Sequence, residues 1–287
     1  MSGFGRKALV SGLVLVAVVL AAPSLATSVT PADPAVQVLA PPPIPVTPSP
    51  APEYAGDMVA AGMNAVPSNM SFGTAVLDLS TGDLETDGVG EFYSASLSKL
   101  MLIVDMLDRG TDLSTSDDQL IARALSVSDD NAMNALWSTF GGPAAMTRVA
   151  TNLGMTDTET PDDPSQWGET TVSPAGYARL YQHILTEMTE DDRDLIVNDL
   201  RTAEPKAADG FPQFFGLLGQ PADVYAKQGW MYYGSKLYLH SAGVVHDNTG
   251  DYIVVLMSVQ PVTAVATAEA GINNVASAML KVLAGDS

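Results

Sequence analysis

The chain contains no cysteine among its 287 residues. It can therefore hold no disulfide framework, no thiolate zinc site, no cysteine nucleophile and no lipid-modified cysteine. Histidine is also scarce, and His183, His240 and His246 are scattered without the spacing of metal ligands. We therefore expect neither a metal site nor a cofactor.

Positive charge is the second shortage. Lysine and arginine number 13 against 33 acidic residues, which gives a formal net charge of -20. Such a surface repels phosphate backbones and anionic lipid, so we expect no nucleic-acid partner and interpret the acidity as serving solubility. Hydrophobic residues make up 46% of the chain, which is ample for a core, and the length suits one or two domains.

The N-terminus has the pattern of a targeting segment. Arg6 and Lys7 precede the apolar run from Ala8 to Ala22, and the small-x-small sequence Ser24-Leu25-Ala26 follows. The run is shorter than the ~20 residues that a spanning helix needs. Residues 1–26 are therefore predicted to be a signal peptide, with an uncleaved N-terminal anchor as the alternative. Either one implies a secreted or cell-envelope protein that contacts the membrane, if at all, only through this segment.

Residues 27–53 are rich in proline and alanine, and include Pro41-Pro42-Pro43 and Pro48-Ser49-Pro50. This composition favours an extended, water-exposed chain over a packed core. We predict a disordered linker here that holds the folded domain, residues 54–287, away from the membrane.

The order of elements within 54–287 predicts the fold class. Apolar, β-rich residues 70–79 and the next segment form a hairpin, and residues 97–107 form a helix that is apolar on nearly every face. Further helices are expected at 118–137, 143–153, 174–188, 190–203 and 264–284, and further strands at 224–228, 236–245 and 252–259. This order predicts an α+β fold with three layers, in which helices flank an antiparallel sheet and an all-helical lobe is inserted between its strands.

Ser96 and Lys99 carry the first chemical signal. They stand at i and i+3, on one face of the apolar helix. A serine needs a base to take its proton, and a lysine serves as that base only when burial and a second cation lower its pKa. The helix N-terminus adds N–H groups where an oxyanion would form. Alone the pair carries little weight, because Ser and Lys three residues apart also occur by chance.

Two more polar clusters follow along the chain. Ser128-Asp129-Asp130-Asn131 could equally be a helix N-cap, and Lys227-Gln228-Gly229-Trp230 could equally be a strand end with a solvated lysine. In this order, with Ser96 and Lys99, the clusters match the set S-x-x-K, S-D-N and K-T-G. Over residues 55–287 the chain therefore resembles the class A serine β-lactamase and penicillin-binding (DD-peptidase-like) family.

The resemblance implies a role for each matching residue. Ser96 would be the acylated nucleophile and Lys99 its general base, and Ser128 would pass a proton to the leaving nitrogen. Lys227 would attract a substrate carboxylate and help to lower the pKa of Lys99. The backbone N–H groups of Ser96 and Trp230 would form the oxyanion hole, where one donor is worth about 3 kcal/mol.

The second and third motifs depart from the family pattern at residues expected to bind substrate. Asp130 stands where the family has asparagine, and a carboxylate only accepts hydrogen bonds and would stabilise the ammonium form of Lys99. Gln228 and Trp230, on either side of Gly229, replace a small hydroxyl residue and a small residue. The Gln228 amide could still bind a substrate carboxylate, while Trp230 would narrow the cleft.

The loop before Ser173 is short where hydrolytic family members carry a glutamate that activates water. Glu169 is the candidate for this deacylation base, although Gly168 displaces it from the family position. The alternative is a loop residue that matches the aspartate before the family's Thr-Thr. The aromatic residues near these motifs either wall the cleft or fill the core: Trp167, Phe211, Phe214, Phe215 and Trp230.

Three functions are compatible with this pattern. We favour an exported penicillin-recognising serine hydrolase that acts weakly, through an acyl-serine, on a small-molecule β-lactam or a cell-wall peptide amide. The main alternative is a catalytically degraded β-lactamase-fold protein that binds or supports structure in the cell envelope. A third is a true β-lactamase that uses Glu169 or another acid. We expect a monomer.

Overall fold

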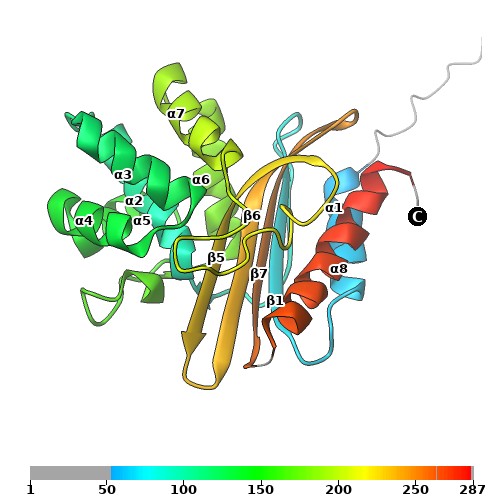
Figure 1. Ribbon diagram of the computed structural model, residues 1–287. Coiled ribbons are helices and arrows are strands. Elements are labelled where there is room, and N and C mark those ends of the chain that lie inside the picture. The colour runs from blue at the N-terminus through cyan, green and yellow to red at the C-terminus, as the bar shows by residue number, and fades with distance from the viewer. Residues whose placement is uncertain (1–52, 263, 286–287) are drawn as a thin grey trace, which may run out of the picture. The chain divides into compact units, whose positions relative to one another are not determined.

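The computed structural model describes residues 53–262 and 264–285 (Figure 1). The predicted signal peptide and nearly all of the predicted linker lie outside the described residues. Every described residue belongs to one compact unit, which falls within Ala51–Ser287. Within the described ranges, no helix combines the length and the apolar character needed to cross a membrane.

A five-stranded antiparallel sheet forms the middle layer of this unit, in the strand order β2-β1-β7-β6-β5. Its first two strands are the predicted hairpin, and the last three form a continuous meander. The strands are β1 (Ser71–Asp78), β2 (Leu84–Gly88), β5 (Asp223–Tyr233), β6 (Lys236–Asp247) and β7 (Gly250–Pro261). A separate two-stranded sheet pairs β3 (Phe92–Tyr93) with β4 (Thr171–Val172).

Helices cover both faces of the large sheet (Figure 1). On one face lie α1 (Tyr54–Asn64) and α8 (Val265–Leu283), and on the other α6 (Pro174–Thr186) packs against β1 and β7. The remaining helices form the lobe inserted between β3 and β5: α2 (Ser98–Asp108), α3 (Thr115–Ser126), α4 (Asp130–Phe140), α5 (Gly142–Asn152) and α7 (Glu190–Arg201). The predicted three-layer arrangement is confirmed.

Side chains along the central strand β7 point alternately into two separate hydrophobic cores. Val255 and Met257 point to the lobe side, while Val254 and Leu256 point to α1 and α8. Strand residues with both faces covered are apolar throughout, which explains why this segment shows no alternating hydrophobic pattern.

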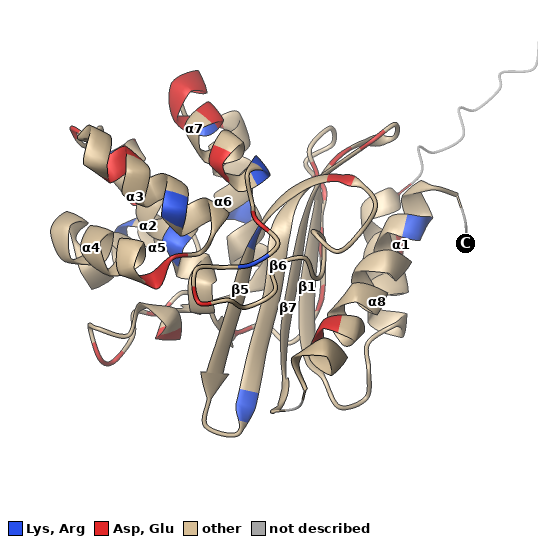
Figure 2. Ribbon diagram, viewed as in Figure 1, with Lys and Arg blue, Asp and Glu red and all other residues tan. Residues whose placement is uncertain are grey.

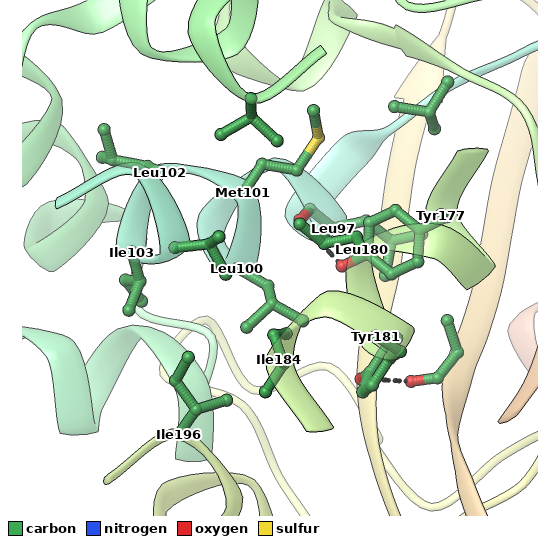
Figure 3. Close-up of a cluster of buried hydrophobic side chains, with 14 of the residues drawn as sticks. Leu97, Leu100, Met101, Leu102, Ile103, Tyr177, Leu180, Tyr181, Ile184 and Ile196 are labelled. Atoms are coloured by element: carbon green, nitrogen blue, oxygen red, sulfur yellow. Dashed lines mark hydrogen bonds between the residues drawn. The ribbon is translucent and has the colours of Figure 1, made fainter. Parts of the chain in front are cut away.

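Helix α2 lies in the middle of the larger core, as its all-round apolar sequence predicts (Figure 3). Its one buried acidic residue, Asp105, accepts two hydrogen bonds of 2.7 Å from the guanidinium of Arg148 on α5 and one of 3.0 Å from Arg109. Bidentate pairing of this kind fixes orientation as well as charge. It therefore anchors the helix that follows Ser96.

One prediction about helices was wrong, and one helix was missed. The single helix predicted at 118–137 is two helices, because Ser128 has a φ of +51° and interrupts it between α3 and α4. Asp129 then caps α4 by accepting hydrogen bonds from the N–H groups of Asn131 and Ala132. Helix α1 was not predicted at all. It approaches α8 so closely that a Cβ on Gly62 would lie 2.7 Å from the Met279 side chain.

Candidate active site

Ser96 lies in the short 3-10 helix Ala95–Leu97 that leads into α2, and its side chain is almost fully buried. The residue before it, Ala95, has a φ of +49°, a left-handed conformation that costs a non-glycine residue on the order of 1 kcal/mol. Neighbouring contacts hold this strained turn in place. The N–H of Ser94 donates to the Thr170 carbonyl at 2.7 Å, and Nε2 of His240 donates to the Tyr93 carbonyl at 2.8 Å.

A continuous chain of hydrogen bonds joins the four side chains that the sequence predicts to be catalytic. Lys99 Nζ lies 2.6 Å from Ser96 Oγ and 3.3 Å from Ser128 Oγ. Lys227 Nζ lies 2.8 Å from the same Ser128 Oγ. The four residues come from the 3-10 turn, α2, the break between α3 and α4, and β5. They meet at one place although up to 131 positions separate them in the sequence (227 − 96 = 131).

Burial controls the ionisation of both lysines. The pKa of Lys99 is lowered chiefly by its complete burial, against the opposing effect of Asp130, whose Oδ1 lies 2.8 Å from Nζ. The pKa of Lys227 is held well below its usual range by burial and by the nearby charge of Lys99. Lowering the pKa of a lysine increases the fraction of its neutral amine, and the neutral amine is the form that can accept a proton from serine.

The side-chain alternation of β5 directs Lys227 and Gly229 toward Ser96. A Cβ on Gly229 would lie 3.1 Å from both Leu97 Cγ and the Ser94 carbonyl oxygen. The glycine thus lets the strand pack directly on the turn that carries the nucleophile. Trp230, the next residue, lines the same cavity as Ser96.

Gln228 is not among the residues that line the cavity over Ser96 in the described chain. Its side chain points away from Ser96, and its amide nitrogen donates to the carbonyls of Gln213 at 2.9 Å and Phe215 at 2.5 Å. Gln228 is only 1% exposed. The reason is the period of two along a strand, which places a residue between Lys227 and Gly229 on the opposite face. Gln228 therefore fastens the 213–215 segment to the back of β5.

A cavity of about 590 Å³ opens over Ser96. Its wall includes Asp130 from α4, together with Asp209 and Phe211 from the loop before β5. The ring of Phe211 stacks on that of Trp230 with 4.8 Å between centroids. Of the aromatic residues considered from sequence, Trp167, Phe211 and Trp230 line this cavity, Phe215 is buried in the core and Phe214 is exposed. Asp209 was not predicted from sequence, because its loop carries no motif.

Trp167, and not Glu169, is the residue of the short loop that lies over Lys99. Its ring lies 4.5 Å from Lys99 Nζ, and its Nε1 donates to Asn134 Oδ1 at 2.8 Å. Glu169 is absent from the residues that line the cavity within the described part of the chain, although its neighbour Gly168 is among them. Its role as a base for water stays a prediction.

His240 lies beneath the nucleophile turn and is neutral because burial lowers its pKa to about 4. Nδ1 accepts from the Ser258 N–H while Nε2 donates to Tyr93, so both nitrogens are satisfied in one tautomer. The unfolded chain takes up this proton near pH 6.5. We therefore expect His240 to contribute stability above pH 6.5 that is lost as the pH falls to about 4, by about 3 kcal/mol.

Urea unfolding at pH 7 and pH 4 would measure this loss. The decrease in unfolding free energy should be smaller in His240→Gln than in the unchanged protein. His246→Gln is the matched control, because His246 is partly exposed. Equal decreases in the unchanged protein and in His240→Gln would contradict the prediction.

Comparison with known proteins gives the family. The profile described as “Beta-lactamase enzyme family” matches residues 108–283, more than half of the chain. The match includes Ser128, Asp130 and Lys227 and begins after Ser96 and Lys99. Proteins named “Putative lipoprotein LppW” from Mycobacterium tuberculosis and Mycobacterium bovis are 34% identical over 201 residues, which cover 65% of this chain and 62% of theirs. The chain thus spans less than two thirds of the length of these relatives.

Solved structures give the same fold. The TLA-3 extended-spectrum beta-lactamase superposes with a TM-score of 0.65 at 15% identity, covering 80% of this chain and 99% of that one. A class A beta-lactamase from Bacteroides cellulosilyticus gives a TM-score of 0.66 at 15% identity with the same coverage. The antiparallel sheet flanked by helices is therefore the β-lactamase fold. Fold and profile agree, and the chain belongs to the beta-lactamase enzyme family.

Proposed function

We propose that this protein is an exported serine hydrolase that forms an acyl-enzyme on Ser96 and releases the acyl group slowly. The observation that carries this proposal is the 2.6 Å separation of Ser96 Oγ and Lys99 Nζ, where both residues are buried and Ser96 lines a cavity. The natural substrate would be a β-lactam or a cell-wall peptide amide.

The acylation step follows from the hydrogen-bond chain. Neutral Lys99 takes the proton of Ser96 while Oγ attacks the amide carbonyl carbon, and the carbonyl oxygen becomes an oxyanion. The C–N bond then breaks, and the leaving nitrogen takes a proton that Ser128 passes on from the lysines. The products are an ester on Ser96 and a free amine. The backbone N–H groups of Ser96 and Trp230 are the proposed oxyanion donors.

Slow release of the acyl group follows from what surrounds Lys99. Hydrolysis of the ester needs a base beside a water molecule, and loss of such a base costs a factor of about 10²–10⁴. Here the Trp167 ring covers Lys99 at 4.5 Å, and Glu169 is not part of the cavity wall in the described chain. We therefore propose that acylation outpaces deacylation.

Two observations favour the alternative of a binding or structural protein. Asp130 forms an ion pair with Lys99, which opposes its role as a base, and Gln228 is occupied behind β5. In this alternative the cavity would bind a wall component without reacting with it.

Location outside the cytoplasm is proposed on two grounds. Residues 1–26 have the signal-peptide pattern, and the mycobacterial relatives carry the name of a lipoprotein. The printed chain has no cysteine to which a lipid could be attached. We therefore propose export, with any membrane attachment through the N-terminal segment itself.

Covalent labelling with a fluorescent penicillin tests the acylation proposal. We expect a stable fluorescent adduct on the purified chain that Ser96→Ala abolishes. Ser98→Ala is the matched control and should retain the adduct, because the Ser98 hydroxyl is buried and donates to the Ala95 carbonyl. Absence of an adduct at every dose would sink the proposal in favour of the binding protein, and rapid turnover of a chromogenic cephalosporin would indicate a true β-lactamase.

A further inference from the structure

The cavity over Ser96 has an acidic wall. Asp130 and Asp209 line it, and no lysine, arginine or histidine is among its lining residues in the described chain. Figure 2 shows acidic residues both where α4 begins and in the loop before β5. The carboxylate of Asp130 is 61% exposed, so a ligand in the cavity can reach it directly.

The two cations of the site are not available to a ligand carboxylate. Lys99 is fully buried, with Nζ donating to Ser96, Ser128 and Asp130, and Lys227 is 1% exposed, with Nζ donating to Ser128 and to the Gln228 carbonyl. Within the described chain, neither lysine is among the residues that line the cavity. When Lys99 is neutral and ready to accept a proton, no cation among the lining residues of the described chain balances the charges of Asp130 and Asp209.

Aromatic rings stand beside these carboxylates. Asp209 Oδ2 accepts from Trp230 Nε1 at 3.0 Å, and its Oδ1 accepts from the N–H of Phe211, so the carboxylate is fixed at the edge of the Phe211–Trp230 stack. An ammonium group gains from a nearby carboxylate and from the face of an aromatic ring together. A carboxylate would be repelled by the same wall.

We propose, on the basis of the proposed acylation of Ser96, that this cavity selects acyl donors that carry an amine, such as a peptide with a basic side chain, over donors that carry a carboxylate. Asp209 and Asp130 are the residues that bind the ammonium group. Pairing of that group with Asp130 also removes part of the field that keeps Lys99 protonated, so the bound substrate favours the reactive form of the base.

Binding to the full chain with Ser96→Ala tests the selectivity without any reaction. The probes are three N-acetylated, C-amidated Phe-X-Gly tripeptides in which X is lysine, acetyl-lysine or glutamate, titrated by NMR. We expect the lysine peptide to bind at least about tenfold more tightly than the glutamate peptide, with acetyl-lysine between them. Added salt should reduce the ratio.

Asp209→Asn should reduce the differences in affinity among the lysine, acetyl-lysine and glutamate peptides, because it removes one carboxylate from the cavity wall. The matched control is Glu85→Gln, an exposed carboxylate on β2 at the opposite edge of the sheet, which should leave the order unchanged. Equal or reversed affinities, no binding of any peptide at millimolar concentration, or an unchanged ratio in Asp209→Asn would overturn the inference. Because Ser96 is absent here, a failure of selectivity is distinct from a failure of acylation, which the penicillin adduct alone reports.

Discussion

Replacing Lys99 by glutamine is expected to lower the rate of Ser96 acylation by about 10²–10⁴-fold, the usual contribution of a general base. In the unchanged protein Nζ lies 2.6 Å from Ser96 Oγ, and burial lowers the pKa of this lysine. Glutamine approximates the length of the stem but cannot take the proton. The fold should survive, because the Asp130 carboxylate left behind is mostly exposed.

The rate of adduct formation with excess fluorescent penicillin, followed by stopped samples on a gel, measures this effect. Lys206→Gln is the matched control, because Lys206 is an exposed lysine in the loop before β5, and it should leave the rate unchanged. Circular dichroism would verify that both variants are folded. A folded Lys99→Gln that acylates at the original rate would exclude Lys99 as the base.

Replacing Asp130 by asparagine is expected to raise the acylation rate at pH 7 by about tenfold. Asp130 raises the pKa of Lys99 against the effect of burial, so its removal lowers that pKa further and increases the neutral fraction. The effect on the pKa of Lys99 is moderated because the carboxylate is 61% exposed and screened by water. The amide can also donate to a substrate carbonyl, which a carboxylate cannot.

The pH dependence of acylation gives the sharper test. The rate should rise with pH through the pKa of Lys99, and the midpoint of this rise should lie lower in Asp130→Asn than in the unchanged protein. Asp162→Asn, an exposed acid in the loop before Trp167, is the control and should leave the midpoint in place. Identical midpoints in all three proteins would show that Asp130 does not restrain the base.

Sequence alone anticipated the parts of the fold that depend on regular patterns. The apolar helix after Ser96 and the final strand meander follow from composition and spacing, because a long apolar run must be buried. Helix α1 was also visible in principle. Its buried residues Ala55, Met58, Val59 and Gly62 follow the i, i+3, i+4, i+7 spacing, although the sequence interpretation assigned no element to the start of the predicted domain.

The candidate site divides in the same way. Ser96, Lys99, Ser128 and Lys227 were predicted from motif order, and the structure brings them together. The position of Trp167 over Lys99 could not be predicted, because it depends on how a short loop folds back across the lobe. The same holds for Asp209, which reaches the cavity through its contact with Trp230 from a loop without regular structure.

The positions of the tryptophans make intrinsic fluorescence a reporter of ligand binding in the cavity. Of three tryptophans, Trp167 and Trp230 border the cavity, whereas Trp137 is largely buried in the lobe and donates to the Pro164 carbonyl. A molecule that enters the cavity displaces water from two indole rings and leaves the third in its original environment. The intrinsic emission of the unlabelled protein should therefore respond to occupancy, with Trp137 supplying a constant background.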